Sequence, residues 1–272
     1  MSFWRRIGGS IRSFWRRAGL KLFGPNSSFL PSAIVSIQQI DFPLRSGQAS
    51  VICDYRTPLY EIVAEVADYD CYQLERCDFA AGSGGVVVDA GANIGVTAVV
   101  LADRFKGRIL CLEPVPENCD WLRRNLERNA VSRAEILPIG LAGRTRRDWL
   151  WRHPEYSVSG HFDSDLRPQA HAGMVGSQAD FLSLADLLVQ TQAEEIVLLK
   201  LDVEGAEHEI IEALDPATAR RILQITLEAH EQGLGRTAGR LARRLQSLGY
   251  RIQCLPERLG RKDLSHILAQ RK

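Results

Sequence analysis

The sequence predicts an α/β fold in which seven strands, most of them parallel, alternate with helices over residues 84–272. Short apolar segments recur and are each followed by a segment with helical periodicity, which is typical of parallel strands joined by helical crossovers. A glycine-rich turn links the first of these strands to the first helix. Charged residues stand where several strands end, and ligands of open α/β sheets bind at the carboxyl ends of the strands.

The alternating region is expected to begin with a valine-rich buried strand and to end with a hairpin. The expected strands cover residues 85–89, 108–113, 135–141, 195–202 and 222–228, and the expected helices cover 94–105, 116–128, 181–189 and 207–214. Spacing of 4-3-4-3 predicts a last helix through Leu234, Ala238, Leu241, Leu245 and Leu248. Residues 250–254 and 266–269 complete the seven strands, and the polar stretch between Ala142 and Ala179 is predicted to be an insert of low order.

Two segments precede this region. Residues 29–83 are predicted to form strands at 33–40 and 50–55 and one or two short helices over 59–79, which pack on the main domain. Residues 1–28 are predicted to be a basic amphipathic helix and a linker, because Phe-Trp-Arg-Arg occurs twice with a period of 11 residues. This period is about three helical turns, so an aromatic face lies opposite five arginines.

Two kinds of partner suit this helix. Residues 2–23 have the pattern of an interfacial helix that binds an anionic membrane surface, which would place the protein peripherally at the inner face of the membrane. Alternatively, the apolar face packs on the main domain or on the second subunit of a homodimer. Sedimentation with anionic vesicles separates the two interpretations.

Composition is that of a folded globular protein and excludes several classes. Apolar residues make up 45% and charged residues 25% of the chain. The formal net charge is only +1, so no nucleic-acid partner is expected. Six cysteines without a CxxC pair argue against a zinc knuckle or a disulfide scaffold and indicate reduced thiols in the cytoplasm. No apolar run reaches the roughly 20 residues that span a bilayer.

The segment Asp89-Ala-Gly-Ala-Asn-Ile-Gly95 follows the first buried strand and opens the first helix. Gly91 permits a tight turn and close ligand approach, Asn93 tolerates left-handed geometry, and Gly95 lets the helix pack near the strand. In this context the loop is a candidate site for a nucleotide-like ligand. A purely structural strand-to-helix turn is the alternative.

Glu113 ends the next strand, 22 residues after Gly91, where a carboxylate can accept hydrogen bonds from both hydroxyls of a ribose. A nicotinamide-dependent dehydrogenase would share the loop and this acid. Its dinucleotide pyrophosphate, however, needs a G-x-G-x-x-G loop, and Asn93 stands where the second glycine belongs.

A second group of charges lies at later strand ends. Lys200, Asp202 and Glu204 alternate with apolar residues and therefore share one side of a strand end, and Glu228 and His230 stand two residues apart at the end of the following strand. Charges in a doubly covered sheet must pair or face a cleft, because unpaired burial is costly. The two interpretations are a structural ion pair and a catalytic site.

At this point the chain resembles the FkbM family of methyltransferases, through VVVDAGANIG, LEPVPEN with later Asn125 and Asn129, LLKLDVEGAE and ITLEAHE. The resemblance implies a Rossmann-like seven-stranded methyltransferase fold with S-adenosylmethionine as donor. It also implies methyl transfer to hydroxyl oxygens of sugars, including glycans, polyketides or other small metabolites. By the same resemblance the methionine part of the donor is surrounded by Asp89, Gly91, Asn93 and Gly95, the ribose is bound by Glu113, and the adenine lies near Leu141 and Ala142.

Methyl transfer from a sulfonium is an in-line displacement that needs an aligned acceptor and a group that removes its proton. Candidate catalytic residues are Lys200, Asp202, Glu204, Glu228 and His230. Asp202, Glu204 and Glu228 could instead hold a divalent cation, magnesium or manganese rather than zinc, that lowers the pKa of the hydroxyl. The sequence leaves base and metal open, and a non-catalytic membrane-docking module that keeps the fold is a further alternative.

Overall fold

A computed structural model describes residues 36–80, 84–152, 160–162, 173–231, 235–256 and 264–271. These residues belong to one compact unit, Ser36–Lys272. The predicted helix over residues 2–23, its linker and the start of the strand expected at 33–40 lie outside the described residues. In the described ranges no helix is long and apolar enough to cross a membrane.

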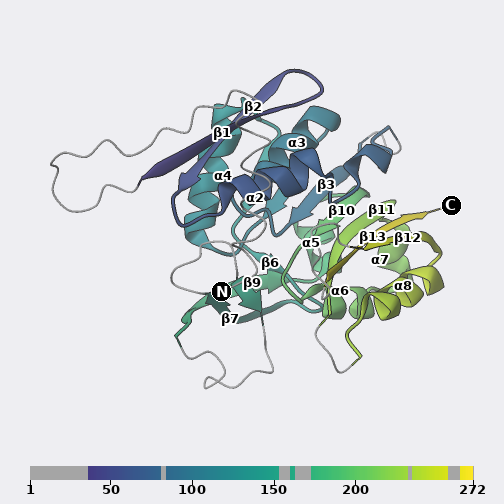
Figure 1. Cartoon of the computed structure of the whole chain (residues 1–272). Helices are drawn as coiled ribbons and strands as arrows, with labels where there is room; N and C mark the ends of the chain where they lie inside the picture. Colours follow the sequence, from purple (N-terminus) through teal and green to yellow (C-terminus); the bar gives the residue numbers. More distant parts are fainter. Residues whose placement is uncertain are drawn as a thin grey trace, which may run out of the picture. The chain divides into compact units, whose positions relative to one another are not determined.

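The centre of the fold is a seven-stranded sheet with the strand order β12-β13-β11-β10-β3-β4-β5 (Figure 1). Its strands are β3 (Val86–Ala90), β4 (Ile109–Leu112), β5 (Ala134–Leu137), β10 (Ile196–Leu201), β11 (Gln224–His230), β12 (Tyr250–Pro256) and β13 (Leu264–Arg271). Strands β11, β10, β3, β4 and β5 run parallel, whereas β13 is antiparallel to both β11 and β12. The predicted fold class, with its seven strands and its C-terminal hairpin, is confirmed.

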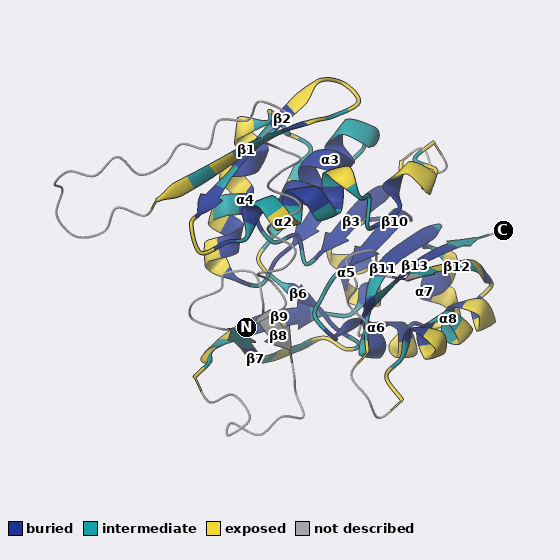
Figure 2. Cartoon of the chain, viewed as in Figure 1, coloured by how far each residue is buried: buried dark blue, intermediate teal, exposed yellow. Residues whose placement is uncertain are grey.

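Burial explains why the central strands are nearly continuous apolar runs. Every residue of β3, β4 and β10 is buried, as Figure 2 shows for the middle of the sheet. Neighbouring residues of a strand point to opposite faces, so Val86 and Val88 belong to one apolar cluster and Val87 to the other. The charged Asp89 and Lys200 are exceptions within these runs.

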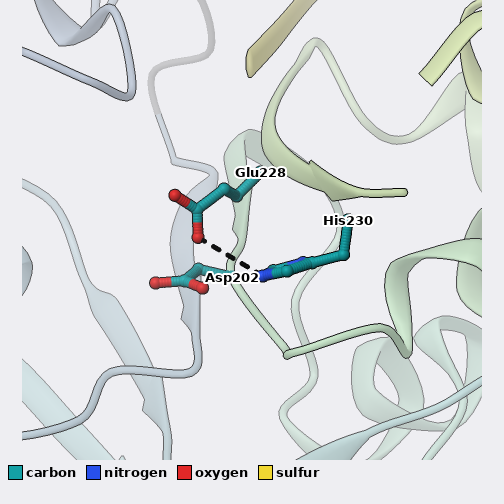
Figure 3. Close-up of side chains that lie close together, drawn as sticks. All are labelled: Asp202, Glu228 and His230. Atoms are coloured by element: carbon teal, nitrogen blue, oxygen red, sulfur yellow. Dashed lines mark ion pairs between the residues drawn. The ribbon is translucent and has the colours of Figure 1, made fainter. Parts of the chain in front are cut away.

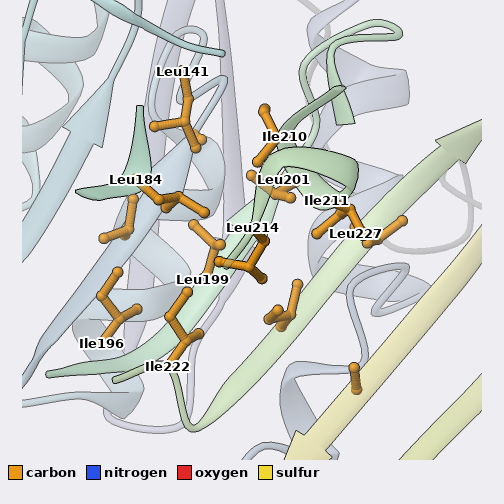
Figure 4. Close-up of a cluster of buried hydrophobic side chains, with 14 of the residues drawn as sticks. Leu141, Leu184, Ile196, Leu199, Leu201, Ile210, Ile211, Leu214, Ile222 and Leu227 are labelled. Atoms are coloured by element: carbon orange, nitrogen blue, oxygen red, sulfur yellow. The ribbon is translucent and has the colours of Figure 1, made fainter. Parts of the chain in front are cut away.

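Helices pack against both clusters. The first cluster, part of which is drawn in Figure 4, includes residues of α5 (Leu184–Gln190), α6 (Glu207–Ala213), α7 (Pro216–Arg220) and α8 (Ala238–Ser247). The second cluster includes residues of α2 (Leu59–Val63), α3 (Val96–Arg104) and α4 (Pro116–Arg128). Helix α4 has the predicted bounds, with Pro116 in its first turn, where the missing N–H of proline costs nothing.

A hairpin of β1 (Ile37–Pro43) and β2 (Gln48–Asp54) packs against α4. Asn125 of α4 and Asn129, which follows the helix, pair with the backbone of β2 as a neighbouring strand would. The Asn125 side chain accepts the N–H of Ile52 at 2.8 Å and donates to its carbonyl at 3.0 Å, and Asn129 does the same for Ser50 at 2.9 and 2.8 Å. The chain then continues through α2, the π-helical turn Ala64–Asp68 and the 3-10 turn Leu74–Arg76.

The described residues of the insert form strands that the sequence did not predict, whereas residues 153–159 and 163–172 lie outside the described ranges. A four-stranded sheet with the order β6-β9-β7-β8 is built from β6 (Gly140–Leu141), β7 (Arg146–Arg152), β8 (Gly160–Phe162) and β9 (Val175–Leu182). β7 pairs antiparallel with β9 along its whole length. Arg147 and Trp149 lie on the exposed face of β7, and Arg146 and Asp148 share the other face with the buried Leu150, so charged residues on both faces mask the strand pattern.

Other elements also differ from expectation. The strand expected at 135–141 is split into β5 and β6. The helix expected from residue 181 begins at Leu184, because Phe181 and Leu182 end β9 and the Ser183 hydroxyl caps the helix by accepting the N–H of Asp186 at 3.1 Å. Helix α7 was not expected; it begins after Asp215, whose carboxylate caps it.

We expect Asn125→Ala to lower the free energy of unfolding by about 2–4 kcal/mol, because it leaves three backbone groups of Ile52 and Ile94 without a partner. Urea denaturation of the full chain measures the effect. Arg123→Ala, on the exposed side of the same helix, is the control and should change stability by less than about 0.5 kcal/mol. Equal effects of the two substitutions would show that Asn125 does not hold the hairpin.

Candidate active site

The glycine-rich loop runs from the end of β3 into α3 and lies against the end of β10. Gly91 has a φ of +75°, and a Cβ built on it would lie 1.8 Å from the carbonyl oxygen of Asp202. Gly95 has a φ of +93°, and its Cβ would lie 2.6 Å from Cδ1 of Leu122 in α4. Only glycine fits either position, so the loop and the polypeptide after β10 are in backbone contact.

Glu113 follows β4 and is buried beside this loop. Its carboxylate accepts hydrogen bonds from the backbone N–H of Asn93 at 2.8 Å, the N–H of Val115 at 2.9 Å and the side-chain amide of Asn118 at 3.4 Å. Burial raises the pKa of Glu113 to about 7, and these hydrogen bonds offset the increase only in part. The carboxyl group therefore changes charge near neutral pH.

A pocket opens where the loop, the end of β4, the end of β10 and the insert meet. Its lining includes Gly91, Asn93, Glu113, Asn118, Leu141, Leu150, Phe181, Asp202, Val203 and Glu204. The apolar side comes largely from the insert, whose inner face places Leu150 and Phe181 there. Oδ1 of Asn118 is buried and has no hydrogen-bond partner among the described residues. An acceptor atom in the wall of a pocket is suited to a ligand that donates a hydrogen bond.

Lys200 lies beneath the loop and is almost fully buried. Its Nζ is 3.0 Å from Oδ1 of Asp89 and 3.7 Å from Oδ2 of Asp202, donates to the carbonyl of Gly91 at 2.8 Å, and lies 4.9 Å from the centre of the Tyr72 ring. Burial would lower the pKa of Lys200, but the charges of Asp89 and Asp202 raise it to about 12. The ammonium therefore stays protonated and links the loop, through the Gly91 carbonyl, to β3 and to the end of β10.

Asp202 directly follows β10 and lines the pocket. The hydroxyl of Tyr72 donates to its Oδ2 at 2.6 Å, and the Thr226 hydroxyl donates to the carbonyl of Tyr72 at 2.7 Å. Burial alone would raise the pKa of Asp202, but the ammonium of Lys200 and the hydroxyl of Tyr72 outweigh burial and hold that pKa below its usual value. Asp202 is thus an ionised carboxylate at the edge of the pocket.

The imidazole of His230, at the end of β11, is surrounded by carboxylates. Oε1 of the fully buried Glu207 accepts the backbone N–H of His230 at 2.9 Å and lies 3.1 Å from its Nδ1. On the other side of the ring, Nε2 lies 3.5 Å from Glu204 and 3.8 Å from Glu228. Burial would lower the pKa of His230, but the hydrogen bond to Glu207 and the negative charges around the ring raise it to about 9.

Glu228 completes this group on β11. Burial and the negative charge of Asp202 raise the pKa of Glu228. Figure 3 shows its carboxylate directed toward His230, with Asp202 beside both. One ligand atom from each of Asp202, Glu228 and His230 lies within 4.8 Å of the other two.

Comparison with known proteins identifies the family. The profile of the methyltransferase FkbM domain matches residues 89–252, more than half of the chain. The chain belongs to this family. The AMB antimetabolite synthetase AmbE of Pseudomonas aeruginosa is 30% identical over 190 residues, which are 57% of this chain but 9% of that protein. Methyltransferase sdnD of Sordaria araneosa is 28% identical over 196 residues, covering 62% of this chain and 74% of sdnD.

Two solved structures are also similar. The methyltransferase FkbM of Methylobacillus flagellatus KT has 18% identity and a TM-score of 0.47, covering 68% of this chain and 43% of that chain. TYW2 of M. jannaschii, solved in complex with AdoMet, has 12% identity and a TM-score of 0.43, covering 90% of both chains.

Within this FkbM domain the predicted site residues fall into two groups. Four of the predicted cofactor-binding residues line the pocket, namely Gly91, Asn93, Glu113 and Leu141, whereas three are buried outside its lining, namely Asp89, Gly95 and Ala142. Of the predicted catalytic residues, Asp202 and Glu204 line the pocket, and Glu228 and His230 lie against them. Lys200 lies in the structural ion pair that the sequence left as an alternative.

The sequence did not reveal several residues that complete the site. Tyr72 and His266 lie far from the motifs in sequence and outside the residues of the family match. Glu207 looked like a charge in the first turn of a helix, and Asn118 like an ordinary residue of α4. The one available signal for Glu207 was its place in the turn between β10 and α6, where Glu204, Glu207 and His208 stand close together in the sequence.

We expect Gly91→Ala to destabilise the FkbM domain by more than about 1 kcal/mol, the penalty of a left-handed conformation alone, because the new Cβ also clashes with the Asp202 backbone. Gly239→Ala, on an exposed turn of α8 with ordinary space around it, is the control and should stabilise the chain by about 0.5–1 kcal/mol. Urea denaturation of the two variants measures these opposite signs. A neutral Gly91→Ala would mean that the loop does not contact β10 as described.

Proposed function

We propose that this FkbM methyltransferase uses S-adenosylmethionine to methylate a hydroxyl oxygen of a sugar, a polyketide or another small metabolite. The observation that carries the proposal is the shared pocket, which is lined both by the loop with Glu113 and by Asp202 with Glu204. Groups that suit a nucleoside and groups that suit a hydroxyl therefore face the same cavity. The family resemblance and the family match support the same reaction class.

The donor would bind at the loop side of the pocket. Glu113 still has free lone pairs after accepting two backbone N–H groups, so it can accept hydrogen bonds from ribose hydroxyls. The free Oδ1 of Asn118 can accept another. Gly91 allows close approach of the methionine part, and Leu141 offers an apolar surface for the adenine.

In the transfer itself, the acceptor oxygen attacks the methyl carbon, the bond between that carbon and sulfur breaks, and its electron pair stays on sulfur as a neutral thioether. The acceptor proton must go to a group of the enzyme. Asp202 is ionised and at the pocket edge, whereas His230 is already protonated at neutral pH. Asp202, and Glu204 beside it, are therefore the groups that can accept the proton or hold a cation that acidifies the hydroxyl.

We expect donor affinity to rise as Glu113 ionises. S-adenosylhomocysteine should bind about tenfold more tightly at pH 8 than at pH 6, because a carboxyl with a pKa of about 7 is about one-tenth ionised at the lower pH and nine-tenths at the higher. Glu113→Gln should weaken binding at pH 8 by about 1.5–3 kcal/mol and abolish the part of the pH dependence that Glu113 causes.

Titration calorimetry measures this affinity. The control is Glu117→Gln, which replaces an exposed glutamate of α4 that pairs with Arg152. Its binding also shows any pH dependence that comes from the ionisable groups of the ligand itself. If Glu113→Gln binds as tightly as this control, Glu113 does not bind the donor.

We expect Asp202→Asn to lower methyl transfer by about 100-fold or more, because an amide can neither accept the proton nor replace a carboxylate ligand. Metabolite extracts incubated with the protein and a methyl-labelled donor reveal the acceptor and the rate. Asp180→Asn, an exposed aspartate of β9, is the control and should keep full activity. Full activity of Asp202→Asn would contradict its role, and donor binding without any labelled product would favour a non-catalytic module.

A further inference from the structure

We propose that the outer face of the insert binds a neutral saccharide, at a site separate from the donor pocket. The inference goes beyond the proposed function and does not depend on it. On β7, Leu150 points to the side that lines the pocket, whereas Trp149 and Trp151 point to the opposite side. Together with Gln178 of β9, the two tryptophans form what we call the tryptophan face.

The ring of Trp151 lies with its flat side on β9. Its cross-strand partner is Gly176, and a Cβ built on Gly176 would lie 2.6, 2.9 and 3.0 Å from three adjacent atoms of the ring. Nearly equal distances to adjacent atoms mean that the ring faces the strand and does not point at it with an edge. Aromatic side chains often cover a glycine of a neighbouring strand in this way, so the position of Trp151 has a structural reason.

Packing does not explain Trp149 in the same way. Its cross-strand partner is the exposed Gln178, and Trp149 is itself 47% exposed. The Trp149 and Trp151 rings are stacked, with centroids 5.7 Å apart and planes that differ by 21°. Adjacent exposed aromatic surface marks a binding site more often than a single exposed side chain does. The tryptophan face is therefore a flat aromatic surface that is open to a ligand.

The chemistry of the tryptophan face selects a saccharide. A sugar ring has a side of polarised C–H groups, which are attracted to the negative face of an aromatic ring. Its rim carries hydroxyls, and the exposed amide of Gln178 can donate hydrogen bonds to them and accept hydrogen bonds from them. The surface thus offers the two kinds of contact that a sugar needs.

The charge of this side of the insert favours a neutral ligand. The next cross-strand pair along β7 and β9 is Arg147 and Asp180, which are both exposed and lie 3.8 Å apart, so their charges cancel. The described residues of β7 and β9 on this side therefore carry no net charge that would attract a nucleic acid, an anionic membrane or a charged peptide. A saccharide bound here lies against the strand that walls the pocket, and its binding needs neither the methyl donor nor Asp202.

Titration of the purified full chain with cellohexaose, maltohexaose and chitohexaose, without a methyl donor, tests the site. Tryptophan fluorescence and calorimetry are the readouts. We expect at least one of these neutral sugars to shift the fluorescence and to bind at one site per chain. Trp149→Ala should weaken that binding at least about tenfold, whereas Trp149→Phe, which keeps a ring, should stay within about threefold of the wild type. Gln178→Ala should weaken it about 2- to 10-fold, the loss of one neutral hydrogen bond.

The matched control is Tyr55→Ala, which removes an exposed aromatic side chain after β2 and should bind the sugar like the wild type. Circular dichroism confirms that each variant is folded before its affinity is compared. S-adenosylhomocysteine should bind equally to the wild type and to Trp149→Ala, because Trp149 does not line the pocket. Loss of sugar binding with unchanged S-adenosylhomocysteine binding therefore places the defect on the tryptophan face.

Failure of all three sugars to bind the wild-type chain would overturn the proposal, as would equal binding by the wild type and Trp149→Ala. Light scattering and sedimentation with phosphatidylcholine vesicles identify other occupants. A dimer or vesicle binding that Trp149→Ala abolishes, in a chain that binds none of the sugars, would assign the tryptophan face to a second copy of the chain or to a lipid surface.

Discussion

The buried ion pair between Lys200 and Asp89 is the interaction on which the site depends. The two residues are register partners on the central strands β10 and β3, and both side chains are almost fully buried. Removing two charges from water costs several kcal/mol per ion, which close geometry and further hydrogen bonds must offset. Here the ammonium also reaches the carbonyl of Gly91. The pair therefore fixes the loop and the end of β10 relative to each other.

This arrangement explains why the loop and Asp202 cannot be placed independently. Gly91 lies so close to the Asp202 carbonyl that a Cβ would not fit, and Lys200 lies beneath both. The carboxylate of Asp202 receives its ionised state from Lys200 and its orientation from the hydroxyl of Tyr72. The loop and the carboxylate of Asp202 are thus held in place by one connected set of contacts.

The site also needs parts of the chain outside the family match. Tyr72 precedes residues 89–252, and His266 follows them. The segment that carries Tyr72 is held by the hydroxyl of Thr226 in β11, which donates to the Tyr72 carbonyl. It follows the hairpin that Asn125 and Asn129 hold through the backbone of β2. The C-terminal hairpin brings His266 against Glu228 through the pairing of β13 with β11. Packing of the two flanking segments therefore completes the surroundings of the Asp202 and Glu228 carboxylates.

Patterns of local sequence predicted what depends on a single strand or helix. Apolar runs predicted the central strands, Pro116 indicated the start of α4, and the glycines indicated the loop. Because ligands bind at the carboxyl ends of parallel strands, the sequence also grouped Asp202, Glu228 and His230, which the structure places close together. The strands of the insert were missed because the charged residues Arg146 and Asp148 share a face of β7 with the buried Leu150 and hide its alternation. Tyr72, Glu207 and His266 were missed because their roles arise from contacts between segments distant in sequence, which periodicity does not encode.

The charge of the group bears on the proposed reaction. An excess of carboxylates favours a positively charged sulfonium in the pocket, but it disfavours ionisation of an acceptor hydroxyl, because a like charge nearby raises a pKa. It would also stabilise the donor more than the transition state, in which the sulfonium charge is being lost, and such ground-state binding does not accelerate transfer. The pKa of His230, raised to about 9, keeps its imidazole protonated at neutral pH, and this positive charge balances part of the excess. A divalent cation held by Asp202 and Glu204 would reverse the sign of the charge near the acceptor oxygen and would therefore favour the ionised form of the acceptor.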